Sequence, residues 1–247
     1  MRFRGENPVF KYGNYDEAYD DTNSATYGGV TTKTAIVLGI IGFVALYFAN
    51  TLNFATIGAS VIAPLIIAPI IAIIAVIATH RLPQFAFVTS IVYSVCEGVF
   101  LGFISAIVAY FFGGELVQMA LVGTFGVLTG MLFLYATGII RVGSFFRKFM
   151  FSMLIGLVIS SLLLFIVSVF STSGFEGFYS LYVGIVVVSV IVSSLYLLVD
   201  FDRISHYVQS NAPREYEWSL ALGLAVTIVW VYIELLRLLV ILSNRRN

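Results

Sequence analysis

The sequence predicts an all-α membrane protein, a bundle of seven transmembrane helices, from three observations. Hydrophobic residues make up 60% of the 247 positions and charged residues only 11%, whereas soluble domains average about 25% charged residues. Long uncharged runs recur along the chain, and each approaches the roughly 20 residues that a helix needs to cross a bilayer. The polar connections between these runs are short, which predicts one compact helical domain.

The N-terminal residues 1–31 are polar and rich in Tyr and Asp, and they lack an apolar period. We expect them to form a flexible cytoplasmic tail that precedes a transmembrane domain at 32–247. No apolar core of a cleavable signal peptide stands ahead of the first long run. That run begins near Thr34 and is long enough to stay in the bilayer.

Seven apolar runs follow one another, and polar or glycine-containing stretches separate them. The stretch NTLNF closes the first run, His80 and Arg81 close the second, and GGE closes the third. The stretches TGIIRVGSFFRK, STSGFEG and SHYVQSNAPREYEW precede the fifth, sixth and seventh runs. The predicted spans are therefore about 33–50, 56–79, 84–111, 116–138, 149–170, 178–201 and 219–242.

Proline and small residues within the spans indicate how the helices bend and pack. Pro64 and Pro69 each remove a backbone donor from the second span and predict a kink there. Small residues allow close backbone approach in a membrane, where lipid supplies no hydrophobic driving force between helices. We therefore expect helix packing at the small residues of the fourth and fifth spans, which are Gly126, Gly130, Ser152, Gly156 and Ser160.

The basic residues favour one orientation of the bundle, because cytoplasmic connections of membrane proteins are enriched in Lys and Arg. Ten of the thirteen Lys and Arg residues fall in the N-terminal tail, at the start of the first span, or after the second, fourth and sixth spans. We expect a cytoplasmic N-terminus. Seven crossings then place the basic ending NRRN outside, so a seventh segment that re-enters the bilayer instead of crossing it stays an alternative.

Charged residues interrupt three of the apolar spans. A charge in the hydrocarbon costs at least about 2.5–3.5 kcal/mol, so such residues usually face protein or water and have a function there. Helical spacing gives each span one polar stripe, and we expect the stripes to meet in a hydrated central cavity; three unrelated hydrogen-bond networks are the alternative. The stripes are Ser90, Ser94, Glu97 and Gly98 on the third span, Ser189, Ser193, Tyr196, Asp200 and Arg203 on the sixth, and Gly223, Thr227, Trp230, Glu234 and Arg237 on the seventh.

Depth along the spans predicts two acidic layers. Glu97 and Glu234 both lie roughly 20 Å into helices that run outward, so they are candidates for a shared site that Arg237 partly neutralises. Alternatively, Glu234 pairs only with Arg237, and Glu97 bonds locally to Ser94. Asp200 and Asp202 form the second layer, near the cytoplasmic mouth.

Several chemistries are not indicated. His80 and His206 flank spans and have no partner at metal-ligand spacing, and no HExxH or GxSxG occurs. We therefore expect no enzyme activity, no bound metal and no cofactor apart from transient Ca²⁺. Cys96, the only cysteine, is expected to be a small packing residue. The formal net charge of zero gives no reason to expect a nucleic-acid partner.

Several motifs together resemble the Bax inhibitor-1 family, also called the transmembrane Bax inhibitor motif family. They are NPVF, TKTA, EGVFLG, TGIIRV, LVDFDRI and EWSLALGLAVTIVWVYIELLRLL, and they extend from Asn7 to about Leu242. The resemblance is closest to a bacterial branch and implies a seven-helix fold in a bacterial plasma membrane. It also implies a pH-sensitive calcium leak, in which two aspartates on the sixth and seventh spans sense protons. Asp200 matches the first aspartate, but Thr227 stands where the family usually has the second.

Three functions stay open on the sequence. The first is a leak channel for Ca²⁺ or another cation, gated by protons that its buried carboxylates sense. Carboxylate oxygens are suitable ligands for a hard cation. A low-dielectric cavity favours the neutral form of a carboxyl group, so protonation can occur at a higher pH than in water. The second is a membrane scaffold or stress-response protein that acts through protein partners without conducting ions. The third is proton-coupled transport of a small solute.

Overall fold

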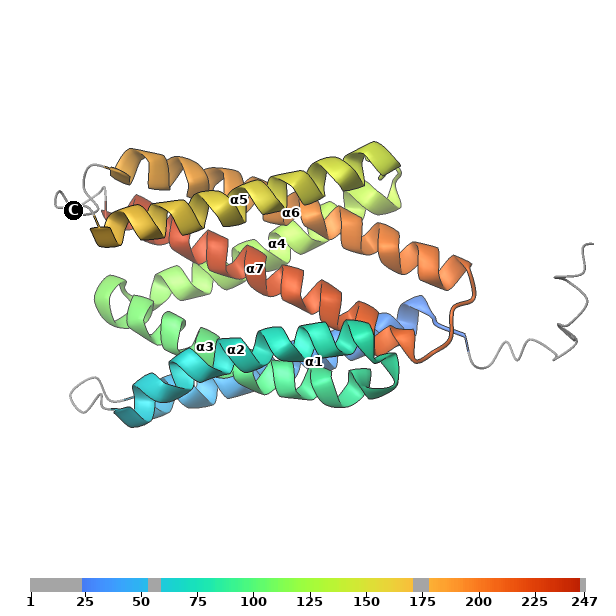
Figure 1. Cartoon of the computed structure of the whole chain (residues 1–247), viewed down its shortest axis with the longest axis horizontal. Helices are drawn as coiled ribbons and strands as arrows, with labels where there is room; N and C mark the ends of the chain where they lie inside the picture. Colours follow the sequence, from blue (N-terminus) through green and yellow to red (C-terminus); the bar gives the residue numbers. More distant parts are fainter. Residues whose placement is uncertain (1–23, 53–58, 171–177, 245–247) are drawn as a thin grey trace, which may run out of the picture.

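A computed structural model describes residues 24–52, 59–170 and 178–244 and confirms the bundle of seven helices (Figure 1). Each helix is long and apolar enough to cross a membrane. The helices are α1 Tyr27–Thr51, α2 Ala59–Arg81, α3 Ala86–Phe112, α4 Gly114–Ala136, α5 Ser144–Phe170, α6 Tyr179–Gln209 and α7 Tyr216–Asn244, and the short 3-10 helix η4 at Pro83–Phe85 joins α2 to α3.

Helix α7 is the central element of the bundle. It runs diagonally between α1, α2 and α3 on one side and α5 and α6 on the other, and α4 crosses behind it (Figure 1). Leu222, Ala225 and Leu236 pack into an apolar cluster with residues of α1, α2 and α3. Ala221 and Val231 pack into a second cluster with α6. These contacts on both sides make α7 the most buried of the seven spans, with 56% of its apolar window inside the protein.

The re-entrant alternative for the seventh segment is not what the structure shows. Helix α7 has 29 residues, and at 1.5 Å per residue it is roughly 43 Å long, which exceeds the hydrocarbon thickness. The described N-terminal and C-terminal ends lie at opposite ends of the bundle (Figure 1). Seven crossings therefore separate them.

A close approach between α1 and α3 involves glycines that the sequence did not single out for packing. A methyl group on Gly102 of α3 would lie 2.6 Å from the backbone oxygen of Ala45 of α1, and one on Gly98 would lie 2.7 Å from Cβ of Val44. Only glycine therefore allows α1 and α3 to pack at this distance.

Among the described residues, the small residues of the fourth and fifth spans do not make the predicted close helix contacts. A methyl group on Gly126, Gly130 or Gly156 would meet no atom within 4 Å. Ser152 and Ser160 line an open groove between α5 and α6. Gly126 and Gly130 are exposed, whereas the small residues of α5 face α6 across this groove without close contact. Spacing alone does not determine which of these arrangements a row of small residues adopts.

Several helices extend beyond the predicted spans. Helix α1 begins at Tyr27, where Thr26 caps it by accepting a hydrogen bond from the backbone N–H of Gly29 at 2.9 Å. Helix α6 continues past residue 201 to Gln209. Loss of apolar character marks where a helix leaves the membrane, and the helix itself can continue as a polar extension. Of the predicted tail, residues 1–23 lie outside the described residues.

Candidate functional site

Asp200 lies beside a cavity at the end of the bundle where α6 turns into α7. Its side chain is buried, and the cavity has a volume of about 180 Å³. The carboxyl oxygen Oδ2 has no hydrogen-bond partner within the described part of the chain. A buried carboxyl group with a free oxygen can take up a proton or attract a cation. The polar side chains that line the cavity with Asp200 are His80, Arg203, Tyr207, Tyr216 and Ser219.

Thr227 of α7 lies close enough to the Asp200 carboxyl group to form a hydrogen bond with it. Its hydroxyl donates a hydrogen bond to the carbonyl oxygen of Gly223, one turn earlier on α7, at 3.4 Å. A hydroxyl can donate to an ionised carboxylate and accept from a protonated one. The Asp200–Thr227 contact can therefore persist in both protonation states while its direction reverses.

Glu234 is bound by neighbours on its own helix. Trp230 Nε1 donates to its Oε1 at 3.1 Å, and Arg237 Nη1 donates to its Oε2 at 3.3 Å. The expected Glu234–Arg237 pair is thus present. Arg237 also lines a second cavity of about 330 Å³, together with Tyr179 and Tyr182 near the opposite end of α6.

Glu97 does not share this site in the structure. Within the described residues, no hydrogen bond or ion pair joins Glu97 to Glu234 or to another side chain. The alternative contact with Ser94 is also absent there, because the Ser94 hydroxyl donates to the carbonyl oxygen of Ser90 at 2.7 Å. Glu97 lines a groove between α2, α3 and α7.

The three polar stripes do not meet in one central cavity. The residues around the Asp200 cavity recur in neither the Arg237 cavity nor the Glu97 groove. Apolar side chains of α7 occupy the centre of the bundle. Helical spacing shows which residues share a face of one helix. It does not show that apolar side chains of α7 occupy the centre of the bundle, where the cavity was expected.

Asp200 and Asp202 lie at similar depth on α6 but do not share one site. Residues two positions apart project from different sides of a helix. Asp202 forms an ion pair with Arg147 of α5, with 3.7 Å between Oδ2 and Nη1, while Asp200 lines the cavity beside α7. Both acids lie near the same end of α6, as expected, but they face different helices.

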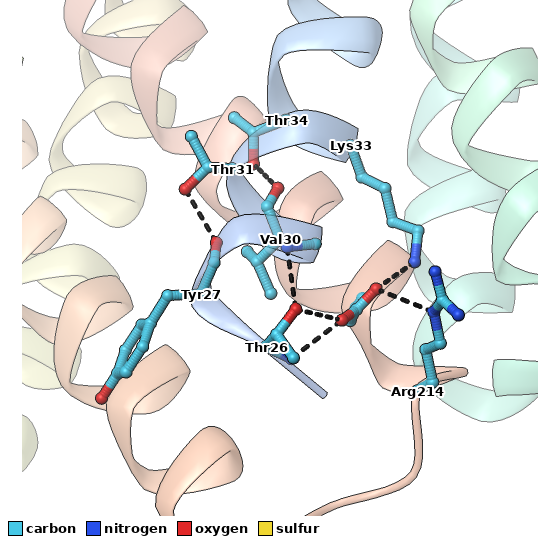
Figure 2. A network of polar contacts seen from close by, with 9 residues as sticks. Thr26, Tyr27, Val30, Thr31, Lys33, Thr34 and Arg214 are labelled. Carbon is cyan, nitrogen blue, oxygen red and sulfur yellow. Dashed lines mark hydrogen bonds and ion pairs between the residues drawn. The ribbon is translucent and has the colours of Figure 1, made fainter. Parts of the chain in front are cut away.

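Sequence reasoning missed a buried carboxylate, Glu217, on the first turn of α7. Its side chain is 1% exposed. The backbone N–H and hydroxyl of Thr26 donate to Oε1 at 2.8 and 3.0 Å, and the Lys33 ammonium donates to Oε2. Arg214 Nε lies 3.8 Å from Oε2. Figure 2 shows Thr26, Lys33 and Arg214 around this carboxylate.

The Glu217 network joins the start of α1 to the start of α7. The backbone N–H of Ala25 donates to the carbonyl oxygen of Ala212 at 2.8 Å, and Ser24 forms a β-bridge with Pro213. Gly29 leaves room for the carboxylate, since a methyl group there would lie 2.1 Å from a Glu217 oxygen. The sequence signal was weak, because Glu217 stands in a polar stretch that resembles an ordinary loop.

Asp200 is the only acidic residue in the lining of its cavity. Among the described residues, no group of three or more His, Cys, Asp or Glu side chains could hold a metal ion. Calcium prefers six to eight oxygen ligands, so one free carboxyl oxygen with a few hydroxyl groups would bind it only loosely.

Comparison with known families places nearly the whole chain in one of them. Residues 7–244 match the family model described as Bax inhibitor 1 like. The comparison with curated proteins gives no match.

Proposed function

The chain belongs to the Bax inhibitor 1 like family, and from that premise we propose that this integral membrane protein is a cation leak pathway controlled by protonation of Asp200. The observation that carries the proposal is the free Oδ2 oxygen of Asp200, buried beside a cavity at one end of the bundle. Polar groups that are buried without a partner are rare, and they often mark a functional site. The ionised form would attract a cation, and the protonated form would not.

The Asp200–Thr227 contact would transmit the protonation state to the central helix. The resemblance to the family implies a second aspartate where this chain has Thr227. A threonine has no charge to repel Asp200, so a single carboxyl group would sense protons here. Reversal of the hydrogen bond between α6 and α7 is the local change that we expect on protonation.

An aromatic pair lies between the Asp200 cavity and the Arg237 cavity and would close a pathway that joins them. The rings of Tyr196 on α6 and Trp230 on α7 pack edge to face, with centroids 6.1 Å apart. Tyr196 is one turn before Asp200, and Trp230 binds Glu234 near the other cavity. We propose that these two rings separate the Asp200 cavity from the Arg237 cavity, and that their separation would open the pathway.

We propose Ca²⁺ as the conducted ion and the lipid bilayer as the protein's environment. Carboxylate and hydroxyl oxygens are the ligands that this hard cation prefers. A leak needs contacts weak enough for the ion to leave, and the sparse oxygens around Asp200 fit this requirement. A scaffold that acts through membrane protein partners is the alternative, and it needs no ion flux.

We propose a cytoplasmic N-terminus in a bacterial plasma membrane. The start of α1 and the connections α2–α3, α4–α5 and α6–α7 lie at one end of the bundle (Figure 1). The basic residues at that end of the described chain are Lys33, Arg81, Arg141, Arg147, Lys148, Arg203 and Arg214. The enrichment of Lys and Arg in cytoplasmic connections favours this orientation, and it would make the Asp200 cavity the cytoplasmic mouth.

Reconstitution into liposomes separates the leak from the scaffold. Purified protein in liposomes that enclose a calcium indicator should admit external Ca²⁺ faster than protein-free liposomes, with no partner added. Liposomes with heat-aggregated protein control for damage to the bilayer. Entry no faster than in the protein-free liposomes at every pH would reject conduction and leave the scaffold.

A further inference from the structure

A groove in the membrane-spanning part of the bundle holds a carboxylate that the proposed leak does not use. The groove lies between α2, α3 and α7 and has a volume of about 330 Å³. Glu97 lines it from the middle of α3, roughly 17 Å from the start of that helix at 1.5 Å per residue. No residue of the Asp200 cavity contributes to its walls.

The walls of the groove leave the Glu97 carboxylate without a counter-charge. Apart from Glu97, its lining residues are apolar or aromatic, and none is basic. Arg237, the one Arg or Lys residue within α7, is paired with Glu234. Within the described residues Glu97 has no hydrogen bond or ion pair. A carboxylate among apolar walls in a membrane is unfavourable unless a proton or a cation neutralises it.

Aromatic rings complete the recognition chemistry of the groove. Tyr93, Phe100 and Trp230 contribute to its walls, and Ile73 and Ile233 add aliphatic surface. Aromatic faces attract organic cations, most strongly when water is excluded. The groove thus combines one carboxyl group, aromatic rings of the kind that attract cations, and a large apolar surface.

We propose that this groove binds a lipophilic organic monocation, such as an ammonium or phosphonium ion with a bulky apolar body, and that Glu97 neutralises its charge. Calcium fits poorly, because it requires several oxygen ligands and Glu97 is the only carboxylate in the lining. An acyl chain would fill the apolar space but leave the carboxylate unpaired. A lipophilic cation satisfies both requirements.

Tetraphenylphosphonium is the probe for this site. The protein is placed in nanodiscs, and binding of the radiolabelled cation is measured by equilibrium dialysis after subtraction of binding to empty nanodiscs. We expect saturable binding of one cation per chain. Triphenylphosphine oxide, which keeps an aromatic body without a net charge, should compete at least tenfold less well than unlabelled cation.

Glu97→Gln removes the charge with little change in volume and should weaken binding at least tenfold. Glu115→Gln, at the exposed first turn of α4, is the matched control and should bind like the unmodified chain. Asp200→Asn should also bind normally, because Asp200 lines a different cavity.

No saturable binding, unchanged binding in Glu97→Gln, or equal competition by the oxide would each overturn the proposal. If Glu97→Gln is not monodisperse, the competition between cation and oxide on the unmodified chain decides alone. Dialysis requires no ion flux, so its result is independent of whether the protein is a leak pathway.

Discussion

At the scale of single residues, the function that we propose depends most on Asp200 and Thr227. Asp200 is buried with one free carboxyl oxygen, and Thr227 lies within hydrogen-bonding reach of it across the α6–α7 contact. One carboxyl group and one hydroxyl group form a simpler sensor than two carboxyl groups, because only one of them titrates.

A second carboxyl group at Thr227 tests this reading. In Thr227→Asp, two carboxyl groups would lie within hydrogen-bonding reach, and their repulsion would make the pair keep a proton to a higher pH. We expect the pH midpoint of calcium flux to move upward. Thr227→Asn is the neutral control and should leave the midpoint near that of the unmodified chain. A midpoint that is the same in both variants would contradict the contact.

Glu217 is a residue on which stability depends. Glu217→Gln removes the charge that Lys33 and Arg214 face, and it leaves a largely buried ammonium without its carboxylate. An unsatisfied buried group costs about 1–3 kcal/mol, so the thermal unfolding midpoint in detergent should fall. Glu215→Gln, at an exposed position two residues earlier, is the control and should not change the midpoint. Equal midpoints for the two variants would show that the network adds no stability.

At the scale of helices, the contact between α1 and α3 depends on two glycines. Gly102→Ala places a methyl group 2.6 Å from the Ala45 oxygen, so the helices must separate. Overpacking of this kind costs about 1–3 kcal/mol, and we expect a lower unfolding midpoint. Gly126→Ala is the matched control, because its methyl group meets no atom within 4 Å. A control variant destabilised as much as Gly102→Ala would refute the close approach.

The helices themselves could be predicted from the sequence, while their facing directions could not. Apolar length identified all seven, because a bilayer requires roughly 20 apolar residues from each. Gly126 and Gly130 have the spacing of a packing motif but face away from neighbouring helices, and Gly98 and Gly102 make the contact instead. Which face is buried depends on neighbours that are distant in sequence, so one helix's pattern does not determine it.

For the candidate site, too, the sequence predicted positions along a helix but not contacts between helices. Helical spacing correctly put Asp200 at one end of α6 and paired Glu234 with Arg237. It did not find Glu217, because its partners Thr26 and Lys33 come from the other end of the chain. It also placed Glu97 beside Glu234, because depth alone does not give the rotation of each helix about its axis.

At the scale of the whole molecule, the orientation in the membrane decides which side the Asp200 cavity faces. Ser210 lies just after α6, at the same end as the cavity, and it is exposed. In a Cys96→Ser background, Ser210→Cys should be labelled by a membrane-impermeant maleimide only after the cells are opened. Tyr179→Cys, at the start of α6, is the control for the opposite end and should be labelled in intact cells. Labelling of Ser210→Cys in intact cells would invert the orientation.

Calcium flux in liposomes, measured from pH 5 to 8 for the unmodified chain and for Asp200→Asn, tests the central claim most directly. Asparagine imitates the protonated side chain, because it is neutral and nearly the same size. We predict that flux through the unmodified chain changes with pH, whereas Asp200→Asn keeps one rate throughout, close to the rate that the unmodified chain shows at low pH. A pH dependence in Asp200→Asn equal to that of the unmodified chain would contradict the role of Asp200 as the proton sensor.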